Sequence, residues 1–460
     1  MAENNIDTPV LDAEGGLSSG FVTAVMEAIA GGDAKALRGL TRDLHAADLA
    51  DLIEALAPEA RVTLIGLLGR SFDAEALAEL DETVRDGLME ALSPSVIASA
   101  IRKLDTDDAL YLIQDLDSAD QQEILAKVSK EDRSALSRAL DYPEGSAGRL
   151  MQTDFVAVPS SWTVGRTLDY TRNDADLPEN FVEVYVIDPG FHLVGTVPVS
   201  RILRNPRDKK IAEIMDSEQT TFTVDDDEDD VAYKFEQYNL VSAAVVDDSN
   251  RLVGVLTVDD IVDVIRDLAE EDILHLGGVS DEAISDSVLD AAKSRFSWLF
   301  LNLLTAVLAS WVISWFDATI EQMVALAVLM PIVASQGGNA GTQTMTVAVR
   351  ALATRELTPL NAMRVVFRES SVGLINGFLF AAIIGLFAWW WFGAGPLGFV
   401  IGAAMVINLL AAALAGILIP MTLDRLDVDP AISSGVFVTT VTDCVGFFAF
   451  LGLASLWLQI

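Results

Sequence analysis

The 460-residue chain is poor in several residue types, and each shortage excludes a class of protein. The single cysteine, Cys444, excludes a framework of disulfide bonds within the chain. There are only 30 lysines and arginines against 68 acids, and the net charge of −38 argues against nucleic acid as a partner, because that polyanion binds to basic surfaces. The three histidines, His45, His192 and His275, all precede the apolar C-terminal part.

The start of the chain lacks the features of a secretory signal peptide. MAENNIDTPV is polar and acidic, without a basic segment or an apolar core, so we expect no such leader here. The acids are also unevenly distributed. Residues 296–460 contain eight acids, five arginines and no lysine, whereas residues 1–295 contain 60 acids and 25 bases. The sequence therefore joins an acidic, water-soluble part to a nearly uncharged, apolar part.

The apolar part contains five segments long enough to cross a membrane. A helix needs about 20 apolar residues to span the hydrocarbon core. A buried core of a soluble protein is the alternative, but five such runs in succession argue against it. The segments are Phe296–Phe316, Ile320–Leu352, Ser370–Phe392, Leu397–Leu423 and Ala431–Leu458.

Basic residues indicate the orientation of these segments, because Arg and Lys mark the cytoplasmic side. Lys293 and Arg295 precede the first segment, whereas Asp317 and Glu321 follow it. We therefore expect a multi-pass protein of the cytoplasmic membrane, in contact with lipid, with cytoplasmic N-terminal domains and its C-terminus outside. Further arginines surround the connection between the second and third segments, namely Arg350, Arg355, Arg364 and Arg368.

The acidic part begins with short amphipathic helices over residues 20–140. The phrases LAPEARVTLIGLL, LSPSVIASAIRKL and LDSADQQEILAKV recur loosely, each with a turn before an apolar-striped helix. This recurrence predicts an all-α superhelical domain, preceded by a flexible N-terminus over residues 1–19. An ordinary irregular helical bundle is the alternative.

A clearer repeat follows these helices. HLVGTVPVSRI at 192–202 matches RLVGVLTVDDI at 251–261, and a strand-like run precedes each copy. The order strand, helix, strand, strand, helix occurs twice and resembles a tandem pair of CBS domains. The resemblance implies two α/β domains, over residues 141–203 and 204–266.

In CBS domains a Gly-x-x-Thr-x-x-Asp turn often holds the ribose of a nucleotide. The second copy has this turn as Gly254, Thr257 and Asp260, which implies a site for ATP at Thr257 and Asp260. The first copy has Pro198 and Arg201 instead.

Acidic residues gather around the second copy. Residues 225–230 read DDDEDD, which also suits a helix N-terminus, where carboxylates interact favourably with the helix dipole. In DDIVDVIRDLAEED, the spacing of Asp260, Asp263 and Asp267 places them on one face of a helix, where they repel one another. A divalent cation prefers oxygen ligands and would remove this repulsion. We favour a cation sensor over a solvated face, because solubility does not require acids to share one face.

The second apolar segment contains the motif GGNAGTQ at its centre. Polar groups persist at membrane depth only where protein buries them or water reaches them, so Asn339 and Gln343 are expected to line a wet path. Gly337, Gly338 and Gly341 would let backbones approach closely or would break the helix. Tight helix packing through small residues is the alternative.

The last apolar segment contains one carboxylate, Asp443, within VFVTTVTDCVGFF. An ionisable residue inside a span is costly and marks a pathway by default. A protonated aspartate that joins helices is the alternative. Two chains would supply two such carboxylates, and Mg²⁺ is usually held by one or two carboxylates while it keeps several waters.

The order of domains and three motifs resemble the MgtE family of magnesium transporters over nearly the entire chain. The resemblance implies a homodimeric, magnesium-selective channel with its pore between the subunits. Cytoplasmic Mg²⁺ would close it by binding between the soluble domains and a connecting helix over residues 267–294, followed by a five-helix membrane domain over 295–460. The motifs are QGGNAGTQTMTVAVRAL, TVDDIVDVIRDLAEEDILHLGGV and DPAISSGVFVTTVTDCVGF.

The same resemblance implies roles for individual residues. Asp443 would be the pore carboxylate that meets the ion. Asn339 is assigned to the pore as well, from its position in the polar motif of the second segment. The regulatory sensor comprises acids of the second CBS copy, the connecting helix and the loop before the last segment. These acids are Asp227, Asp229, Asp259, Asp260, Asp263, Asp267, Glu271, Asp272 and Asp429.

Other functions stay open on the residues alone. An enzyme is not expected, because no span contains histidine and no pairing of a nucleophile with a base is recognisable. Oxygen ligands without a Cys or His pair disfavour zinc but do not separate the other divalent cations. A transporter of Co²⁺, Mn²⁺ or Ca²⁺ is therefore an alternative. A cation-coupled secondary transporter is another, although five segments give no inverted repeat.

Overall fold

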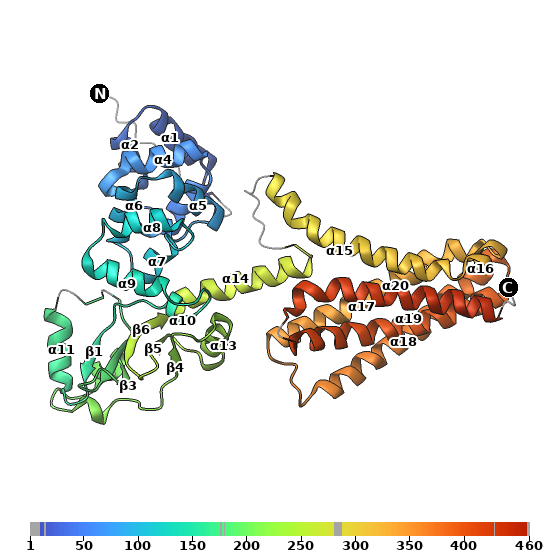
Figure 1. The fold of residues 1–460 in the computed structure, drawn as a ribbon. Coiled ribbons are helices and arrows are strands. Elements are labelled where there is room, and N and C mark those ends of the chain that lie inside the picture. Colours follow the sequence, from blue (N-terminus) through green and yellow to red (C-terminus); the bar gives the residue numbers. More distant parts are fainter. Residues whose placement is uncertain are drawn as a thin grey trace. The chain divides into compact units, whose positions relative to one another are not determined.

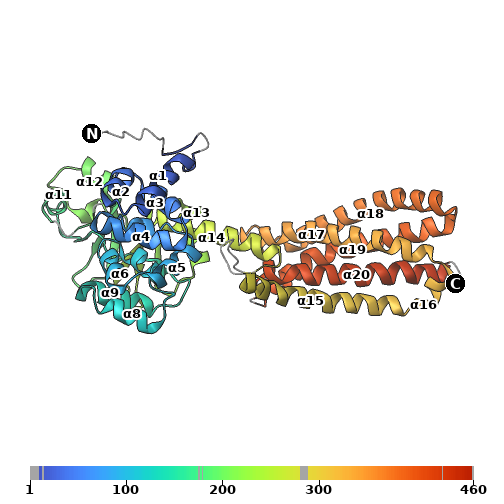
Figure 2. The same cartoon turned by 90° about the horizontal axis from the view of Figure 1, so that it is seen from above.

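The computed structural model describes residues 10–12, 15–174, 177–178, 180–279, 288–426 and 428–457. The chain divides into two compact units, Met1–Arg266 and Asp267–Ile460. Helix α14 (Val258–Leu276) contains the boundary between them. Figure 1 shows the elements of each unit, and Figure 2 shows them from above.

Nine short α-helices form the first part of the described residues in the first unit. Ser18, Asp33 and Ser129 each accept a hydrogen bond from a backbone amide of the helix that follows, which satisfies donors that a first turn leaves free. Apolar side chains of successive helices form one continuous core, and the helices pack against neighbours close in sequence, which confirms the all-α domain. The helices are α1 (Ser19–Ala30), α2 (Ala34–Thr41), α3 (Ala46–Glu54), α4 (Pro58–Leu68), α5 (Glu82–Ala91), α6 (Pro94–Ile101), α7 (Thr106–Tyr111), α8 (Ser118–Leu125) and α9 (Lys130–Leu140).

Two three-stranded sheets follow, and they share one topology. In each sheet the first strand pairs in parallel with the second, and the second pairs antiparallel with the third. Both middle strands also show a register shift near their ends. This repetition confirms the predicted pair of CBS domains. The elements are α10 (Ala147–Leu150), β1 (Ala157–Pro159), α11 (Val164–Asn173), β2 (Glu183–Ile187), β3 (Leu193–Pro198), α12 (Val199–Arg204), β4 (Thr221–Thr223), α13 (Glu228–Tyr238), β5 (Ser242–Val246) and β6 (Leu252–Thr257).

The two sheets share a core. Tyr185 of β2 and Val246 of β5 belong to one cluster of buried side chains. The turns before β3 and β6 also meet, because His192 and Arg251 form an isolated antiparallel bridge. Since β6 leads directly into α14, this packing sets the position of the acids at the start of α14.

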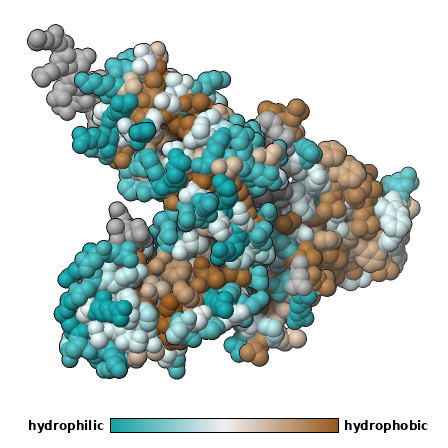
Figure 3. Space-filling model, turned by 60° about the vertical axis from the view of Figure 1, so that its left-hand side comes forward, coloured by the Kyte–Doolittle hydropathy of each residue, from teal (hydrophilic) through white to brown (hydrophobic). Residues whose placement is uncertain are grey.

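The second unit is a bundle of long helices. Helix α19 lies inside it and packs against α17, α18 and α20, whereas α15 and α18 leave most of their apolar side chains exposed. Figure 3 shows this apolar surface of the bundle and the mainly hydrophilic surface of the first unit. The helices are α15 (Val288–Ser314), α16 (Asp317–Gln322), α17 (Ala325–Ala353), α18 (Ala362–Phe392), α19 (Gly395–Asp424) and α20 (Pro430–Trp457).

Four of the described helices, α15, α18, α19 and α20, are long and apolar enough to cross a membrane by length and composition. Helix α17 has 29 residues, but its centre carries the amide-rich motif and is less apolar. Its length and its packing between α19 and α20 fit a fifth crossing.

The motif does not interrupt α17, which is helical throughout from Ala325 to Ala353. The idea that its glycines break the helix is therefore excluded. Close approach of a neighbouring helix is found at Gly337 and Gly341 but not at Gly338, where a Cβ atom would meet nothing within 4 Å. A Cβ atom at Gly337 would collide with the side chain of Asn408, and one at Gly341 would lie 2.6 Å from Val438 Cγ1. These glycines thus admit α19 and α20 into contact with α17.

Candidate functional site

Asp443 lies in the middle of α20, at its contact with α17. Thr442 is fully buried, and the missing side chain of Gly341 leaves the space that Val438 and Thr442 fill. The Asp443 side chain is half-buried, and no hydrogen bond or ion pair to it occurs among the described residues. A carboxylate on a membrane-spanning helix is costly without a partner, so this one requires water, an ion or another chain.

The amides that were predicted to line a path lie exposed on α17. Asn339 and Gln343 are one helical turn apart, and Thr342 lies beside them on the same exposed side. Asn339 and Asp443 are not joined by a hydrogen bond; their helices meet where Gly341 packs against Thr442. Because amides are unfavourable in contact with lipid, this side of α17 requires water or protein against it.

Sequence reasoning missed Asn408, a fully buried amide on α19. Its Nδ2 atom donates a hydrogen bond of 2.9 Å to Val333 O of α17, while its Oδ1 atom has no partner among the described residues. Gly337 and Gly446 leave room for it on α17 and α20. A lone amide within the apolar run MVINLLAAALAG was the available signal. Asn408 joins the helices that carry Asn339 and Asp443.

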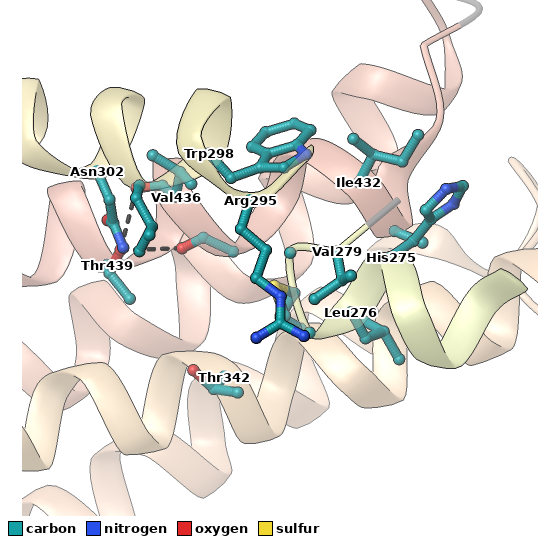
Figure 4. A pocket seen from close by; sticks show the side chains of 16 residues that line it. His275, Leu276, Val279, Arg295, Trp298, Asn302, Thr342, Ile432, Val436 and Thr439 are labelled. Carbon is teal, nitrogen blue, oxygen red and sulfur yellow. Dashed lines mark hydrogen bonds between the residues drawn. The ribbon is translucent and has the colours of Figure 1, made fainter. Parts of the chain in front are cut away.

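A cavity of about 470 Å³ adjoins these helices (Figure 4). Its walls come from the end of α14, the first half of α15, the middle of α17 and the first turns of α20. Thr342 and Thr439 line it, and each is about one helical turn from Asn339 or Asp443. In Figure 4 the Arg295 side chain extends into the cavity toward Thr342. The cavity therefore lies next to the predicted pathway residues.

Three predicted sensor acids of the second unit meet at the start of α20. Asp429 Oδ1 accepts a hydrogen bond of 2.7 Å from the Ala431 amide, and Asp429 Oδ2 lies 3.0 Å from His275 Nδ1. Glu271 Oε1 lies 3.7 Å from the other ring nitrogen of His275. Burial and the negative charge of Asp429 raise the pKa of Asp272. The structure thus brings Glu271, Asp272 and Asp429 together around one histidine.

A second acid cluster lies in the first unit, between α7 and the start of α14. The carboxyl groups of Asp107 and Asp260 are within hydrogen-bonding reach of each other. Burial and the charge of Asp260 raise the pKa of Asp108 to about 7, and they also raise the pKa of Asp107. Burial and the charge of Asp259 raise the pKa of Asp260 to about 6. Carboxylates that crowd in this way fit a divalent cation, which would supply the missing positive charge.

The α7 acids were not predicted. Asp105, Asp107 and Asp108 occur in LDTDDAL, where the sequence alone cannot distinguish them from acids that suit a helix N-terminus. Tertiary contacts bring them to Asp260. One of these contacts is visible at Thr106, whose Oγ1 atom lies 2.7 Å from Thr153 Oγ1 in the segment before β1.

Thr257 and Asp260, the predicted ribose-binding pair, contact each other. Thr257 Oγ1 donates a hydrogen bond of 2.6 Å to Asp260 Oδ2. The Asp260 side chain therefore has two partners, this hydroxyl and the carboxyl group of Asp107.

The remaining predicted sensor acids are placed differently. Asp263 Oδ1 lies 3.6 Å from Arg266 Nη1, and Asp267 is exposed further along α14. Asp227 caps α13 by accepting a hydrogen bond of 3.0 Å from the Asp229 amide, as the helix-dipole interpretation of DDDEDD requires. Among the described residues, no hydrogen bond joins Asp227 to Asp260.

A third group of acids surrounds an arginine side chain. Carboxylate oxygens of Glu82, Asp86 and Asp115 lie within 4.8 Å of one another. The Arg85 side chain is 1% exposed, and its Nη2 atom lies 2.9 Å from Asp115 and 3.0 Å from Asp86. Its guanidinium also stacks 3.8 Å from the centre of the Tyr111 ring. This group is therefore an ion-pair network and not a site for a metal ion.

Comparisons with known proteins cover all of these regions. Residues 330–453 match the family described as divalent cation transporter, residues 44–145 match the MgtE intracellular N domain, and residues 211–267 match the CBS domain. The chain is 32% identical to the magnesium transporter MgtE of Thermus thermophilus over 449 residues, which cover 95% of this chain and 99% of that protein. It is 36% identical to the magnesium transporter MgtE of Enterococcus faecalis, over 72% of this chain and 73% of that protein.

A solved structure is also similar. The cytosolic domain of the Mg²⁺ channel MgtE in complex with ATP is 30% identical and matches 53% of this chain and 99% of that chain, with a TM-score of 0.49. The family match and the Thermus thermophilus relative extend over both the soluble and the apolar part. The chain therefore belongs to the MgtE family of divalent cation transporters.

Proposed function

We propose that this chain carries Mg²⁺ into the cell through a pathway that contains Asp443. The observation that carries this proposal is a half-buried carboxylate on α20 without a hydrogen bond among the described residues. Its helix packs against α17, the helix that carries the exposed amides. Magnesium loses its waters reluctantly and is usually bound through one or two carboxylates. Asp443 would hold a hydrated ion, with Asn339 contacting its water shell.

The exposed polar side of α17 supports a homodimer with the pathway between its subunits. Asn339, Thr342 and Gln343 cannot face lipid favourably, whereas a second copy would enclose them with water. A two-fold axis would also bring two Asp443 carboxylates to one ion, because such an interface uses the same surface of both subunits.

The two acid clusters support closure by cytoplasmic Mg²⁺. Glu271, Asp272 and Asp429 would form one site, and the acids of α7 with Asp260 would form another. Magnesium ions shift the equilibrium between open and closed protein only if they bind the closed state more tightly than the open state. This condition is met if closure brings more carboxylates within reach of each ion. We further propose that the N-terminal domains are cytoplasmic and that the C-terminus is outside, from the placement of the arginines.

Nucleotide binding at Thr257 and Asp260 remains a separate proposal from the motif. The hydrogen bond between these two side chains would have to open for Asp260 to bind a ribose, so ATP and the acid cluster would compete for the same carboxylate.

Growth of a magnesium-uptake-deficient bacterial strain tests the function. The chain should restore growth at low external magnesium, whereas an Asp443→Ala variant expressed at the same level should not. Failure to restore growth, together with uptake of manganese or calcium by cells that express the chain, would favour a transporter of another divalent cation. Equal rescue by the variant would remove Asp443 from the pathway.

A further inference from the structure

A cavity of about 590 Å³ in the first unit is not accounted for by ion transport. It lies between α9, the segment before β1, the turn before β3 and the start of β6. Its volume is within the range of about 300–1,000 Å³ that small-molecule sites occupy. None of its walls comes from the acid clusters of the proposed sensor. Two basic and three aromatic residues line it, namely Lys130, Arg138, Tyr142, Phe155 and Phe191.

The two basic side chains are exposed and have no ion pair or hydrogen bond among the described residues. Glu131 also lines the cavity, but no ion pair joins it to Lys130 or Arg138. Residues 1–295 contain 60 acids and only 25 bases, so this part of the chain is strongly acidic. Two basic side chains without an ion pair at one cavity are therefore a local exception. Positive charge at a concave surface attracts anions.

The fold fixes the positions of the aromatic residues that line the cavity. Phe191 is 64% exposed and has a φ of 64°, a backbone conformation that is unfavourable for a bulky residue. Its carbonyl oxygen accepts a hydrogen bond of 3.0 Å from the Leu252 amide, which holds this turn against β6. Asn250 has the same left-handed conformation in the equivalent turn of the second sheet, so the turn sets the backbone here and holds the Phe191 ring at the surface.

The other two rings are fixed as well. Phe155 makes an edge contact with Tyr185, with ring centres 6.3 Å apart. Tyr142 packs over Gly148, where a Cβ atom would lie 2.7 Å from the ring. The cavity thus presents preformed aromatic surface together with positive charge.

We propose that this cavity binds a nucleotide, with its base against the aromatic rings and its phosphates on Lys130 and Arg138. Bases stack on aromatic side chains, and lysine and arginine bind phosphate through charge-assisted hydrogen bonds. The site differs from the Thr257 and Asp260 turn. Leu252, which lines the cavity, is the first residue of β6, and Thr257 is the last. At the usual rise per residue of a β-strand, the two are about 15 Å apart along the strand.

Binding to the full-length protein, purified in detergent, tests the proposal. Fluorescence of a methylanthraniloyl derivative of ADP would report binding, and unlabelled ADP, ATP and inorganic phosphate would compete. The double variant Lys130→Ala/Arg138→Ala should raise the Kd for ADP at least about tenfold, because hydrogen bonds to charged groups contribute that much to affinity.

Two further variants separate loss of the site from loss of the fold. Phe191→Asn removes the ring but suits the left-handed backbone, so it should weaken binding and leave thermal stability unchanged or higher. Lys35→Ala/Arg70→Ala removes the same charge from exposed positions of the same unit and should leave the Kd unchanged.

Three results would overturn the proposal. The first is no binding of the labelled ADP at millimolar concentration. The second is competition by inorganic phosphate at the same concentrations as ADP, which would indicate a simple anion site. The third is loss of binding in Thr257→Ala together with full binding in Lys130→Ala/Arg138→Ala, which would place the nucleotide at the turn after β6.

Discussion

His275 Nδ1 lies 3.0 Å from Asp429 Oδ2, so the last turn of α14 is joined to the residue that directly precedes α20. The other oxygen of Asp429 accepts a hydrogen bond from the Ala431 amide and caps α20. The charge of Asp429 and its capping role can be separated by substitution, because asparagine is also a good N-cap residue.

Asp429→Asn should weaken closure by internal Mg²⁺ and leave α20 intact. We expect the magnesium concentration that gives half-maximal inhibition to rise about fivefold or more, at the lower end of allosteric coupling free energies. Asp429→Ala should show the same shift and should also lose about 1 kcal/mol of stability with the cap. Currents in excised patches measure the first effect and thermal unfolding measures the second. Normal inhibition in both variants would place the sensor elsewhere.

Asp443→Ala should abolish magnesium flux, because it removes the carboxylate proposed to meet the ion. Asp443→Asn should reduce the flux strongly, since a neutral amide attracts a divalent cation far less. Uptake into proteoliposomes with a fluorescent magnesium indicator measures this. The neighbouring substitution Cys444→Ser is the matched control and should transport normally. Flux in the Asn and Ala variants equal to that of the parent would contradict the assignment.

Two adjacent glycines of α17 should respond differently to alanine. A Cβ atom at Gly337 would meet the buried Asn408 amide, whereas one at Gly338 would meet nothing within 4 Å. Gly337→Ala should therefore cost about 1–3 kcal/mol of stability through overpacking. Gly338→Ala should leave the stability of the subunit nearly unchanged. Thermal unfolding in detergent compares them, and equal effects would mean that α17 and α19 do not pack at Gly337.

The fold could be predicted because its signals are local. Leucine spacing in the N-terminal helices, the repeated strand pattern of the CBS pair and the long apolar runs each report on residues close in sequence. Helix α17 was harder, because the glycines of its motif are compatible with either a broken helix or a close contact. The contacts that decide for close packing, with Asn408 of α19 and Val438 of α20, are both distant in sequence.

The candidate sites could be predicted only in part, because each combines segments that are distant in sequence. Glu271 and Asp272 are adjacent, but their meeting with Asp429 depends on how α14 ends beside α20. The acids of α7 reach Asp260 through the packing of the helical domain on the second sheet. Helix periodicity contains no information about either contact.

Arg85 should be essential for the stability of the helical domain. It is buried between three carboxylates and the Tyr111 ring, so Arg85→Ala would leave a cavity and mutually repelling acids. We expect a loss of about 3 kcal/mol in the free energy of unfolding, at the lower end for a broken buried ion pair because the acids are partly exposed. Glu82→Gln, at a side chain 70% exposed, should cost less than about 1 kcal/mol. Urea unfolding followed by circular dichroism measures both, and equal losses would contradict the central role of Arg85.

The α7 cluster should make both stability and magnesium binding depend on pH. Without Mg²⁺, the pKa of Asp108 is raised from 3.8 to about 7 in the folded protein, so the fold binds more protons than the unfolded chain between these values. Its contribution to stability is therefore lost as the pH rises through about 7. Magnesium requires deprotonated ligands, so it should stabilise the protein more at about pH 8 than at about pH 5.

Thermal unfolding of the full-length protein in chelator, and then with added magnesium, checks these signs. Between about pH 5 and pH 8, the unfolding temperature of Asp108→Asn should fall less than that of the parent protein, because the amide does not titrate. It should also gain less from magnesium at the higher pH. Asp43→Asn, at an exposed turn outside the cluster, is the matched control and should behave like the parent at both pH values. If Asp108→Asn and Asp43→Asn respond alike to pH and to magnesium, the α7 acids do not bind the regulatory ion.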